Sequence, residues 1–239
     1  MNLFYFPQPI IEGQTIQLYE TEARHASGVL RSKIGDQITV TNGLGTMAKA
    51  SIISNSNKNF SLLIDSADHN YRPISYKLHI AVAPTKNIDR YEWFLEKSTE
   101  IGISKITPLL ASHSERKIVK HDRSEKILIS AMKQSQKAFL PTLEELTSIK
   151  SFLLEVENSC AQKFIAHCDD EATKTELYHA LEAGKEYIIL IGPEGDFSPE
   201  EVVLAHKCGF KSVALGPERL RTETAALYAT TVAATKNLI

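Results

Sequence analysis

The sequence predicts an α/β protein in which a small β-rich domain, residues 1–71, precedes a larger α/β domain, residues 72–239. Short runs of alternating apolar and polar residues dominate the first part, whereas strands alternate with helices in the second. Tyr71–Pro73 marks the change between the two patterns. A length of 239 residues, with 43% hydrophobic and 23% charged residues, is sufficient for two globular cores.

The first domain is expected to contain a short barrel of strands and one helix. Apolar residues at helical spacing predict a helix over Glu20–Leu30. The turn Asn42–Gly45 separates two alternating runs, as in a hairpin. Core packing explains the aromatic segment Phe4–Phe6 better than stacking on bases does. The expected strands are Gln37–Thr41, Ala48–Ile53 and Phe60–Ile64.

The second domain is expected to contain a parallel sheet whose strands are separated by helices. Apolar residues recur at helical spacing from Ile88 to Gly102 and from Leu128 to Phe139. A final helix, Glu223 to about Asn237, is rich in Ala and Thr, so another backbone can approach it closely. The expected strands are Lys77–Ala83, Lys105–Leu109, Lys163–Ala166, Tyr187–Ile191 and Ser212–Leu215.

Several classes of protein are disfavoured by what the sequence lacks. Without a run of about 20 apolar residues or a secretory N-terminal pattern, the chain is expected to be cytoplasmic, with no membrane partner. Cys160, Cys168 and Cys208 have no C-x-x-C spacing, which fits reduced thiols better than a disulfide or metal framework. No metal site is expected.

The charge is unevenly distributed, although the net charge is only −2. Residues Ala111–Phe139 contain seven basic side chains and three acidic ones, a net charge of +4. Such a segment can contact nucleic acid phosphates, or it can simply be the solvated face of a helix.

The most informative loop is Gly192–Phe197, which follows an apolar strand and precedes a helix start. Ser198 and Glu201 form a capping box, and Pro199 occupies the first helical position. A glycine-containing loop between a strand and a capped helix presents backbone N–H groups at the carboxyl edge of a parallel sheet, where ligands bind. The loop is therefore either a cofactor cradle or a plain structural turn.

A second loop of the same kind runs from Leu215 to Thr222 and precedes the final helix. Thr222 is expected to cap that helix. Arg219 and Arg221 lie ahead of its positive end, where cations are disfavoured, and this local conflict indicates a functional site. Neither loop carries a phosphate-binding G-x-G-x-x-G or Walker pattern, which disfavours dinucleotides and triphosphates as ligands.

Three segments together resemble the RsmE family of ribosomal RNA methyltransferases, which are of the SPOUT class. They are Arg90–Gly102, the Ile-Gly-Pro-Glu-Gly loop at Ile191–Gly195, and Leu215–Ala225 with its Leu-Arg-Thr-Glu-Thr-Ala core. At the N-terminus, His25 and the stretch Val29–Asp36 resemble the RNA-facing segment of the family's PUA-like barrel. The resemblance extends over nearly the whole chain.

The resemblance implies a fold, a reaction and partners. Residues 72–239 would form a SPOUT methyltransferase domain tied in a trefoil knot, and residues 1–71 a PUA-like RNA-binding barrel. The cofactor would be S-adenosylmethionine, and the product a uridine methylated at N3 in 16S ribosomal RNA. The substrate would be naked RNA or the assembled small subunit, and the active form a homodimer.

The resemblance also assigns residues to the two binding sites. The cofactor pocket would be lined by Leu190, Gly192, Gly195, Leu215, Gly216, Leu220 and Thr222. Basic side chains from both domains would contact the RNA, namely Arg24, His25, Arg31, Lys33, Arg90, Arg116 and Lys137.

This chain departs from the family pattern at three positions. Asp196 stands where a second glycine is usual, but Asp tolerates positive φ better than most residues. Glu218 replaces a basic residue, and Arg219 follows one place later. Lys137 replaces an arginine, which keeps the charge but not the bidentate fork.

The chemistry requires help at the nucleophile, because uracil N3 carries a proton that must leave before or during attack. Arg221 is the candidate for stabilising charge on the uracil carbonyls, and Glu223 is the candidate base. Glu223 could equally be a carboxylate that only stabilises the helix end. The rival hypothesis is a noncatalytic RNA-binding dimer that uses the same barrel and basic face.

Overall fold

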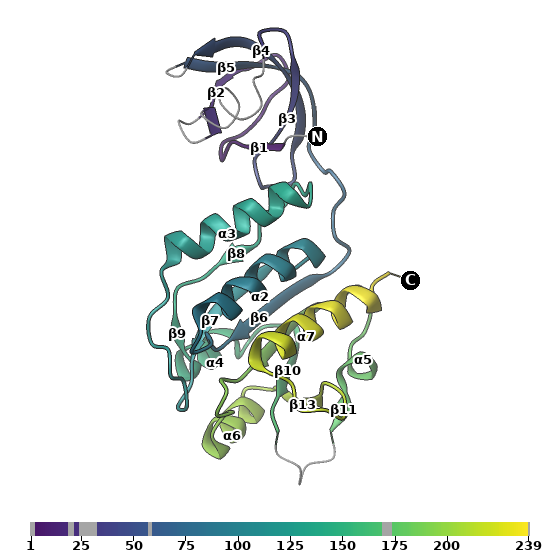
Figure 1. The fold of residues 1–239 in the computed structure, drawn as a ribbon. Helices are drawn as coiled ribbons and strands as arrows, with labels where there is room; N and C mark the ends of the chain where they lie inside the picture. Colours follow the sequence, from purple (N-terminus) through teal and green to yellow (C-terminus); the bar gives the residue numbers. More distant parts are fainter. Residues whose placement is uncertain (1–2, 19–21, 24–32, 57–58, 169–173, 239) are drawn as a thin grey trace. The chain divides into compact units, whose positions relative to one another are not determined.

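The computed structural model describes residues 3–18, 22–23, 33–56, 59–168 and 174–238. The chain divides into two compact units (Figure 1). The first consists of Met1–Pro73 together with Ile129–Leu140, and the second of Ile74–Leu128 together with Pro141–Ile239. The return of residues 129–140 to the first unit was not expected from the sequence.

The first unit is built on a five-stranded sheet with the order β1-β3-β4-β5-β2. Its strands pair antiparallel, except for β1, which pairs parallel with β3. Phe4 and Phe6 are buried in its core, as expected. The predicted strands are confirmed, and two of them are longer than predicted. The strands are β1 (Leu3–Tyr5), β2 (Thr15–Gln17), β3 (Gln37–Thr41), β4 (Met47–Ser56) and β5 (Asn59–Asp68).

The turn between β3 and β4 binds the returning segment of the first unit. The Gly45 N–H donates to the Ala138 carbonyl at 2.8 Å, and the Leu140 N–H donates to the Gly43 carbonyl at 2.8 Å. A side chain at Gly45 would collide with the Phe139 ring, because an added Cβ would lie 2.6 Å from it. The hairpin turn predicted from the sequence therefore also fixes the chain at residues 138–140.

The second unit contains an eight-stranded sheet, in which β11-β13-β10-β12-β6-β7-β8 follow one another and β9 pairs with β7. All of these pairings are parallel, which confirms the predicted α/β class. The five predicted strands correspond to β6 (Lys77–Val82), β7 (Lys105–Leu110), β10 (Gln162–Ala166), β12 (Glu186–Ile191) and β13 (Lys211–Ala214). Three two-residue strands, which the sequence did not predict, are β8 (Thr142–Leu143), β9 (Thr147–Ser148) and β11 (Thr175–Glu176).

Helices cover both faces of this sheet. On one face, Ile188 and Leu190 pack in a cluster with α4 (Ile149–Val156) and with Ala205 of α6 (Pro199–Lys207). The opposite face is covered by α7 (Thr222–Lys236), which contacts β6, β12, α2 (Ile88–Ile101) and α5 (Leu177–Ala180). Ala226, Ala229 and Ala233 of α7 are fully buried, as the small side chains predicted.

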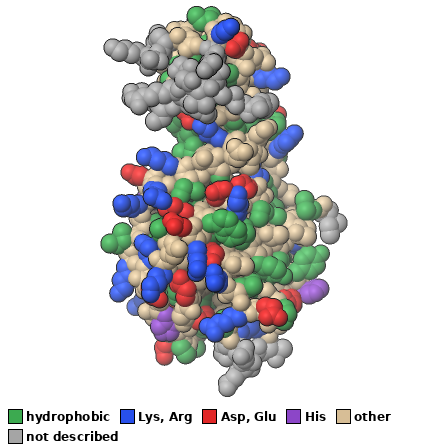
Figure 2. Space-filling model, viewed as in Figure 1, with side chains coloured by type: hydrophobic (Ala, Val, Ile, Leu, Met, Phe, Trp, Pro, Cys, Tyr) green, Lys and Arg blue, Asp and Glu red, His purple; other side chains and the backbone are tan. Residues whose placement is uncertain are grey.

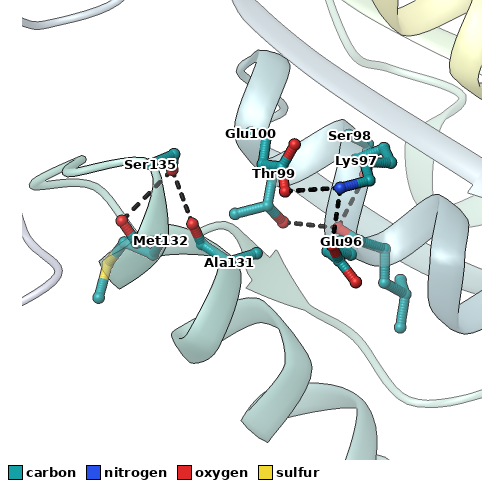
Figure 3. A network of polar contacts seen from close by, with 9 residues as sticks. Glu96, Lys97, Ser98, Thr99, Glu100, Ala131, Met132 and Ser135 are labelled. Carbon is teal, nitrogen blue, oxygen red and sulfur yellow. Dashed lines mark hydrogen bonds and ion pairs between the residues drawn. The ribbon is translucent and has the colours of Figure 1, made fainter.

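Large apolar side chains remain exposed on α2 and α7. Trp93 of α2 is 42% exposed, and Tyr228 of α7 is 41% exposed. Figure 2 shows hydrophobic side chains gathered over these two neighbouring helices. Elsewhere on α2, Lys97 lies between the carboxylates of Glu96 and Glu100, at 2.7 and 2.9 Å (Figure 3).

The helix α3 (His121–Gln134) ends earlier than the predicted pattern, which continued to Phe139. The Ser135 hydroxyl donates back to the Ala131 carbonyl at 2.7 Å (Figure 3). Gln136 then takes a left-handed conformation, with φ +55°, and the Lys137 N–H donates to the Met132 carbonyl. This is the Schellman arrangement that ends many helices, here built without glycine.

Most of the predicted helix over Glu20–Leu30 lies outside the described residues. Of its expected apolar stripe, Ala23 is described, and it is buried in the first core. Among the helices of the described part of the chain, none combines the length and the apolar character needed to cross a bilayer.

Candidate functional site

Three neighbouring parallel strands of the second unit end at the same level of the sheet. Ala166, the last residue of β10, pairs with Ile191, the last residue of β12, and with Val213 of β13. The strand β12 lies on one side of β10, whereas the next strand, β13, lies on the other. Ligands of open α/β sheets bind outside the carboxyl ends of the strands at such a reversal of order.

A cavity of about 760 Å³ lies at this edge of the sheet. Its walls are the strand ends, the described residues His167, Cys168 and Lys174 after β10, the loop Gly192–Asp196 after β12, and the loop Leu215–Arg221 after β13. Thr222 and Ala225 from the first turn of α7 complete it. The two glycine-containing loops singled out in the sequence therefore form one cavity.

A hydrogen bond joins the first residue of α7, directly after the second loop, to the first loop. The Thr222 hydroxyl donates to the Gly192 carbonyl at 3.1 Å, and Thr222 is buried. The prediction that Thr222 caps α7 is wrong. Arg221 is the N-cap residue, and its side chain makes no capping hydrogen bond. The Thr222 hydroxyl does not cap the helix either, because it donates to Gly192 of the neighbouring loop.

The loop after β12 is held from both sides. His113, in the loop after β7, lies with its Nδ1 2.9 Å from the Gly195 carbonyl and 3.0 Å from the Asp196 carbonyl. A Cβ at Gly195 would lie 2.9 Å from the Cβ of His113, so this glycine permits a close approach of the two loops. On the other side, the Asp196 carboxylate accepts the Cys168 N–H at 2.7 Å.

The helix after this loop begins as the sequence predicts. The Ser198 side chain accepts from the Glu201 N–H, and the Glu201 carboxylate accepts from the Ser198 N–H at 2.8 Å. The second carboxylate oxygen of Glu201 accepts the backbone N–H and the hydroxyl of Ser112 in the loop after β7. The capping box thus also ties two loops of the carboxyl edge together.

Charged side chains of both signs line the cavity. Lys174, Arg219 and Arg221 are basic, whereas Glu194, Asp196 and Glu218 are acidic. The Cys168 thiol lies among them, and burial followed by the Asp196 charge raises its pKa, while Arg219 and Lys174 act in the opposite direction. A ligand that carries a positive and a negative group at separate positions could pair with these charged side chains.

The structure brings five of the seven predicted cofactor residues to the cavity: Gly192, Leu215, Gly216, Leu220 and Thr222. The other two have different surroundings. Leu190 is fully buried in the core on the α4 and α6 face of the sheet. Gly195 lies against His113.

The two candidate catalytic residues lie side by side in sequence but have different environments. Arg221 is exposed and lines the cavity. Glu223 is buried, and its Oε1 lies 3.8 Å from Nε of Arg90 at the start of α2. Arg90, a candidate RNA contact, is thus already engaged with the carboxylate that was the candidate base.

The other candidate RNA contacts are scattered over the chain. Arg116 is committed to the backbone, since its Nε and Nη2 donate to the Thr85 and Lys86 carbonyls at 2.9 and 2.6 Å. Lys33 is exposed, and burial lowers the pKa of Lys137 in the first unit. Arg24, His25 and Arg31 lie outside the described residues.

Sequence reasoning missed the loop after β10 as a wall of the cavity. His167, Cys168 and Lys174 line it, and Lys174 donates to the His167 carbonyl at 2.6 Å. The sequence carried one usable signal, namely that His167 and Cys168 follow a predicted strand directly. Because the sheet is parallel, the end of that strand had to lie at the same edge as the two glycine loops.

Comparison with known proteins shows the class of protein to which the chain belongs. Residues 72–234 match the RNA methyltransferase domain family, and the chain belongs to that class. The "probable rRNA-methyltransferase" of Porphyromonas gingivalis has a similar structure, with 38% identity and a TM-score of 0.88 over 96% of this chain and 95% of that one.

Two further relatives define the particular family. The ribosomal RNA small subunit methyltransferase E of Buchnera aphidicola (subsp. Acyrthosiphon pisum) is 30% identical over 97% of this chain and 87% of its own length. The enzyme of the same name from Neisseria gonorrhoeae, solved with S-adenosylmethionine bound, is 30% identical with a TM-score of 0.80, covering 96% of this chain and 95% of that one. The chain belongs to the ribosomal RNA small subunit methyltransferase E family.

Proposed function

We propose that this chain transfers a methyl group from S-adenosylmethionine to N3 of a uridine in the 16S ribosomal RNA of the small subunit. The observation that carries the proposal is the cavity at the carboxyl edge, whose two glycine loops are joined through Thr222 and Gly192. Its volume of about 760 Å³ is within the usual range for a small-molecule site. The Neisseria gonorrhoeae relative, solved with this cofactor, supports the same assignment.

The residues of the cavity suit an adenosine-like ligand with a charged tail. Main-chain groups of the loops Gly192–Asp196 and Leu215–Arg221 supply donors and acceptors for a heterocycle. Apart from Gly216 and its two neighbours in sequence, none of the described residues has an atom within 4 Å of the position of a Cβ at Gly216, so the space beside this glycine is open among them. We assign cofactor contacts to Gly192, Leu215, Gly216, Leu220 and Thr222. Bound S-adenosylmethionine would supply an electrophilic methyl group.

Arg221 has the position and charge to assist the nucleophile. Loss of the N3 proton places negative charge on the uracil ring and its carbonyl oxygens, which a guanidinium stabilises. Arg221 is exposed at the cavity and precedes α7, whose N-terminus adds partial positive charge. We assign Glu223 a structural role rather than that of the base. Its carboxylate is buried and pairs with Arg90 at the start of α2.

The target uridine must be unpaired, because N3 lies on the Watson–Crick edge that pairing hides. We assign RNA contact to the first unit as a PUA-like barrel, through Arg24, His25, Arg31 and Lys33 with Lys137 of the returning segment. For Arg116 the assignment is withdrawn, since its guanidinium already holds two backbone carbonyls. The reaction would take place in the cytoplasm, on the RNA or on the assembled subunit.

We further propose a knotted fold for the second domain and a homodimer as the active form. A trefoil knot in residues 72–239 would account for a final helix that starts against the loop after β12. A homodimer would cover the exposed Trp93 and Tyr228 on α2 and α7. No metal takes part in the proposed reaction.

Arg221→Ala tests the role of the cavity in methyl transfer. We expect it to reduce methylation of small-subunit RNA by about a hundredfold, the usual effect of losing one charge-stabilising donor. Binding of S-adenosylmethionine, measured by titration calorimetry, should stay within about twofold, because Arg221 acts on the uracil. Arg219→Ala, which removes the same charge two residues earlier, is the matched control and should cost less activity.

Two results would reject the proposal. Equal loss of cofactor binding and methylation in Arg221→Ala would remove its role in stabilising the uracil anion. Mass spectrometry of ribosomal RNA from cells lacking this chain should reveal one lost 3-methyluridine, and an unchanged set of methyluridines would exclude the reaction.

A further inference from the structure

Asp196 lies where two walls of the cavity meet. It belongs to the loop after β12, and Cys168 belongs to the loop after β10. The two strands are paired through their last residues, Ala166 and Ile191, so their loops leave the sheet next to each other. Both Asp196 and Cys168 line the cavity.

Both carboxylate oxygens of Asp196 accept backbone hydrogen bonds. Oδ2 accepts the N–H of Cys168 at 2.7 Å, across the cavity wall, and Oδ1 accepts the N–H of Phe197 at 2.8 Å, within its own loop. These are short, charge-assisted bonds, which are stronger than bonds between neutral groups. One side chain therefore connects Cys168, just after β10, with the loop after β12.

The backbone of Asp196 is held in a conformation that needs a reason. Its φ is +62°, in the left-handed region that glycine adopts without strain and that Asp tolerates better than most other residues. A glycine would satisfy the turn, but it would leave the Cys168 N–H without this acceptor. Strain retained at a functional site is often part of how the site is arranged.

We propose that Asp196 is a positioning residue for the cofactor, whose carboxylate fastens Cys168, just after β10, to the loop after β12 and thereby sets the affinity for S-adenosylmethionine. The proposal rests on the assignment of the cavity as the cofactor site. His113 holds the same loop at Gly195 and Asp196 from the opposite side, so the loop is fixed at both edges.

The decisive variant is Asp196→Gly, because it separates the turn from the carboxylate. Glycine accepts the φ of +62° without strain, so the turn should keep its conformation and the variant should still fold, which a thermal melt checks. Both hydrogen bonds are lost, so we expect calorimetric titration with S-adenosylmethionine to give about tenfold weaker binding. In methylation assays the KM for the cofactor should rise by a similar factor, while kcat at saturation stays within about twofold.

Two further variants complete the test. Asp196→Asn keeps one acceptor oxygen and tolerates left-handed φ, so it should recover part of the affinity. Glu200→Gln removes a nearby charge at the exposed start of α6 without touching either loop contact, and it should bind like the unaltered protein.

The possible outcomes distinguish this proposal from the assignment of the cavity. If Asp196→Gly binds S-adenosylmethionine within twofold of the unaltered protein, Asp196 is only a turn residue and the proposal fails. The same conclusion follows if Glu200→Gln weakens binding as much, or if kcat falls while KM does not change. If the unaltered protein itself does not bind the cofactor, the assignment of the cavity fails, and the positioning role fails with it.

Discussion

Gly195 illustrates how a residue can match a binding motif and still serve another purpose. The two glycines of the Ile-Gly-Pro-Glu-Gly loop are of a kind that supplies a left-handed backbone or lets a ligand approach. Neither Gly192 nor Gly195 has a positive φ, however. The left-handed position of this loop is Asp196, and Gly195 makes room for His113. The sequence can predict that a loop needs small residues, but not which neighbour requires each one.

His79 is a partly buried titratable residue in the second unit. It lies on β6, its Nε2 is 2.7 Å from the Thr107 hydroxyl, and its ring meets the edge of Phe152. Burial, with a smaller contribution from the charge of Lys105, lowers the pKa of His79 from 6.5 to about 3. The folded protein therefore keeps this imidazole neutral in mild acid.

This lowered pKa predicts a loss of stability in mild acid. Below pH 6.5 the unfolded chain binds a proton at His79 that the folded chain does not, so the free energy of unfolding decreases as the pH falls. The slope approaches about 1.4 kcal/mol per pH unit until the folded pKa is reached. Urea unfolding at several pH values between 6.5 and 5 measures this slope. Most carboxylates titrate below this pH range and contribute little to it.

His79→Gln removes the titration and keeps a hydrogen-bonding partner for Thr107. It should reduce the pH dependence of the free energy of unfolding by close to one proton. The same change at the exposed His179 of α5 controls for the general effect of replacing a histidine by glutamine. An equal slope in His79→Gln and the unaltered protein would show that other groups cause the acid sensitivity.

At the scale of the elements, the predicted capping box of α6 was correct, whereas the predicted cap of α7 and the predicted end of α3 were wrong. Ser198, Pro199 and Glu201 predicted the start of α6 correctly, because the capping box is a local arrangement of side chain and backbone. The end of α3 gave no such signal. Its apolar spacing continues to Phe139, but residues 138–140 bond to the β3–β4 turn, and the helix stops to permit this.

Gln136 provides the prediction for this helix end. It occupies the left-handed position that glycine fills at many helix ends, with φ +55°. Gln136→Gly should therefore raise the free energy of unfolding, by about 1 kcal/mol, through relief of this strain. Urea denaturation monitored by circular dichroism measures the change.

The control for Gln136→Gly lies two residues earlier. Gln134 is the last residue of α3 and is exposed, so Gln134→Gly should lower stability by up to about 1 kcal/mol. If both substitutions lower stability alike, the left-handed turn is not a source of strain in the folded protein.

For the whole molecule, the sequence predicted the α/β class and the main strands of the second unit, because hydrophobic runs and turn residues are local features. The cavity was predicted in part. Two glycine loops identified two of its walls, but the contribution of His167, Cys168 and Lys174 depends on the order in which strands pair. The recruitment of Ile129–Leu140 to the first unit likewise depends on contacts distant in sequence.

The proposed homodimer predicts that the exposed face of α2 and α7 controls association. Stable interfaces bury about 800 Å² per partner and centre on aromatic side chains, which Trp93 and Tyr228 provide. Replacing both with serine should shift the protein towards a monomer in analytical ultracentrifugation. Ile118→Ser, at a side chain that is 75% exposed on another segment, should leave the mass unchanged. A dimer that survives the double change would place the interface elsewhere.

The hydrogen bonds of Ala138 and Leu140 to the β3–β4 turn have a consequence for dissecting the protein. A fragment excised at Pro73 would leave the Gly45 N–H and the Gly43 carbonyl without their partners and would remove the Phe139 ring from its place against Gly45. Residues 1–73 alone therefore do not make up a complete folding unit. Exchange of this module between relatives, in the laboratory or in evolution, has to carry a dozen residues from the middle of the chain with it.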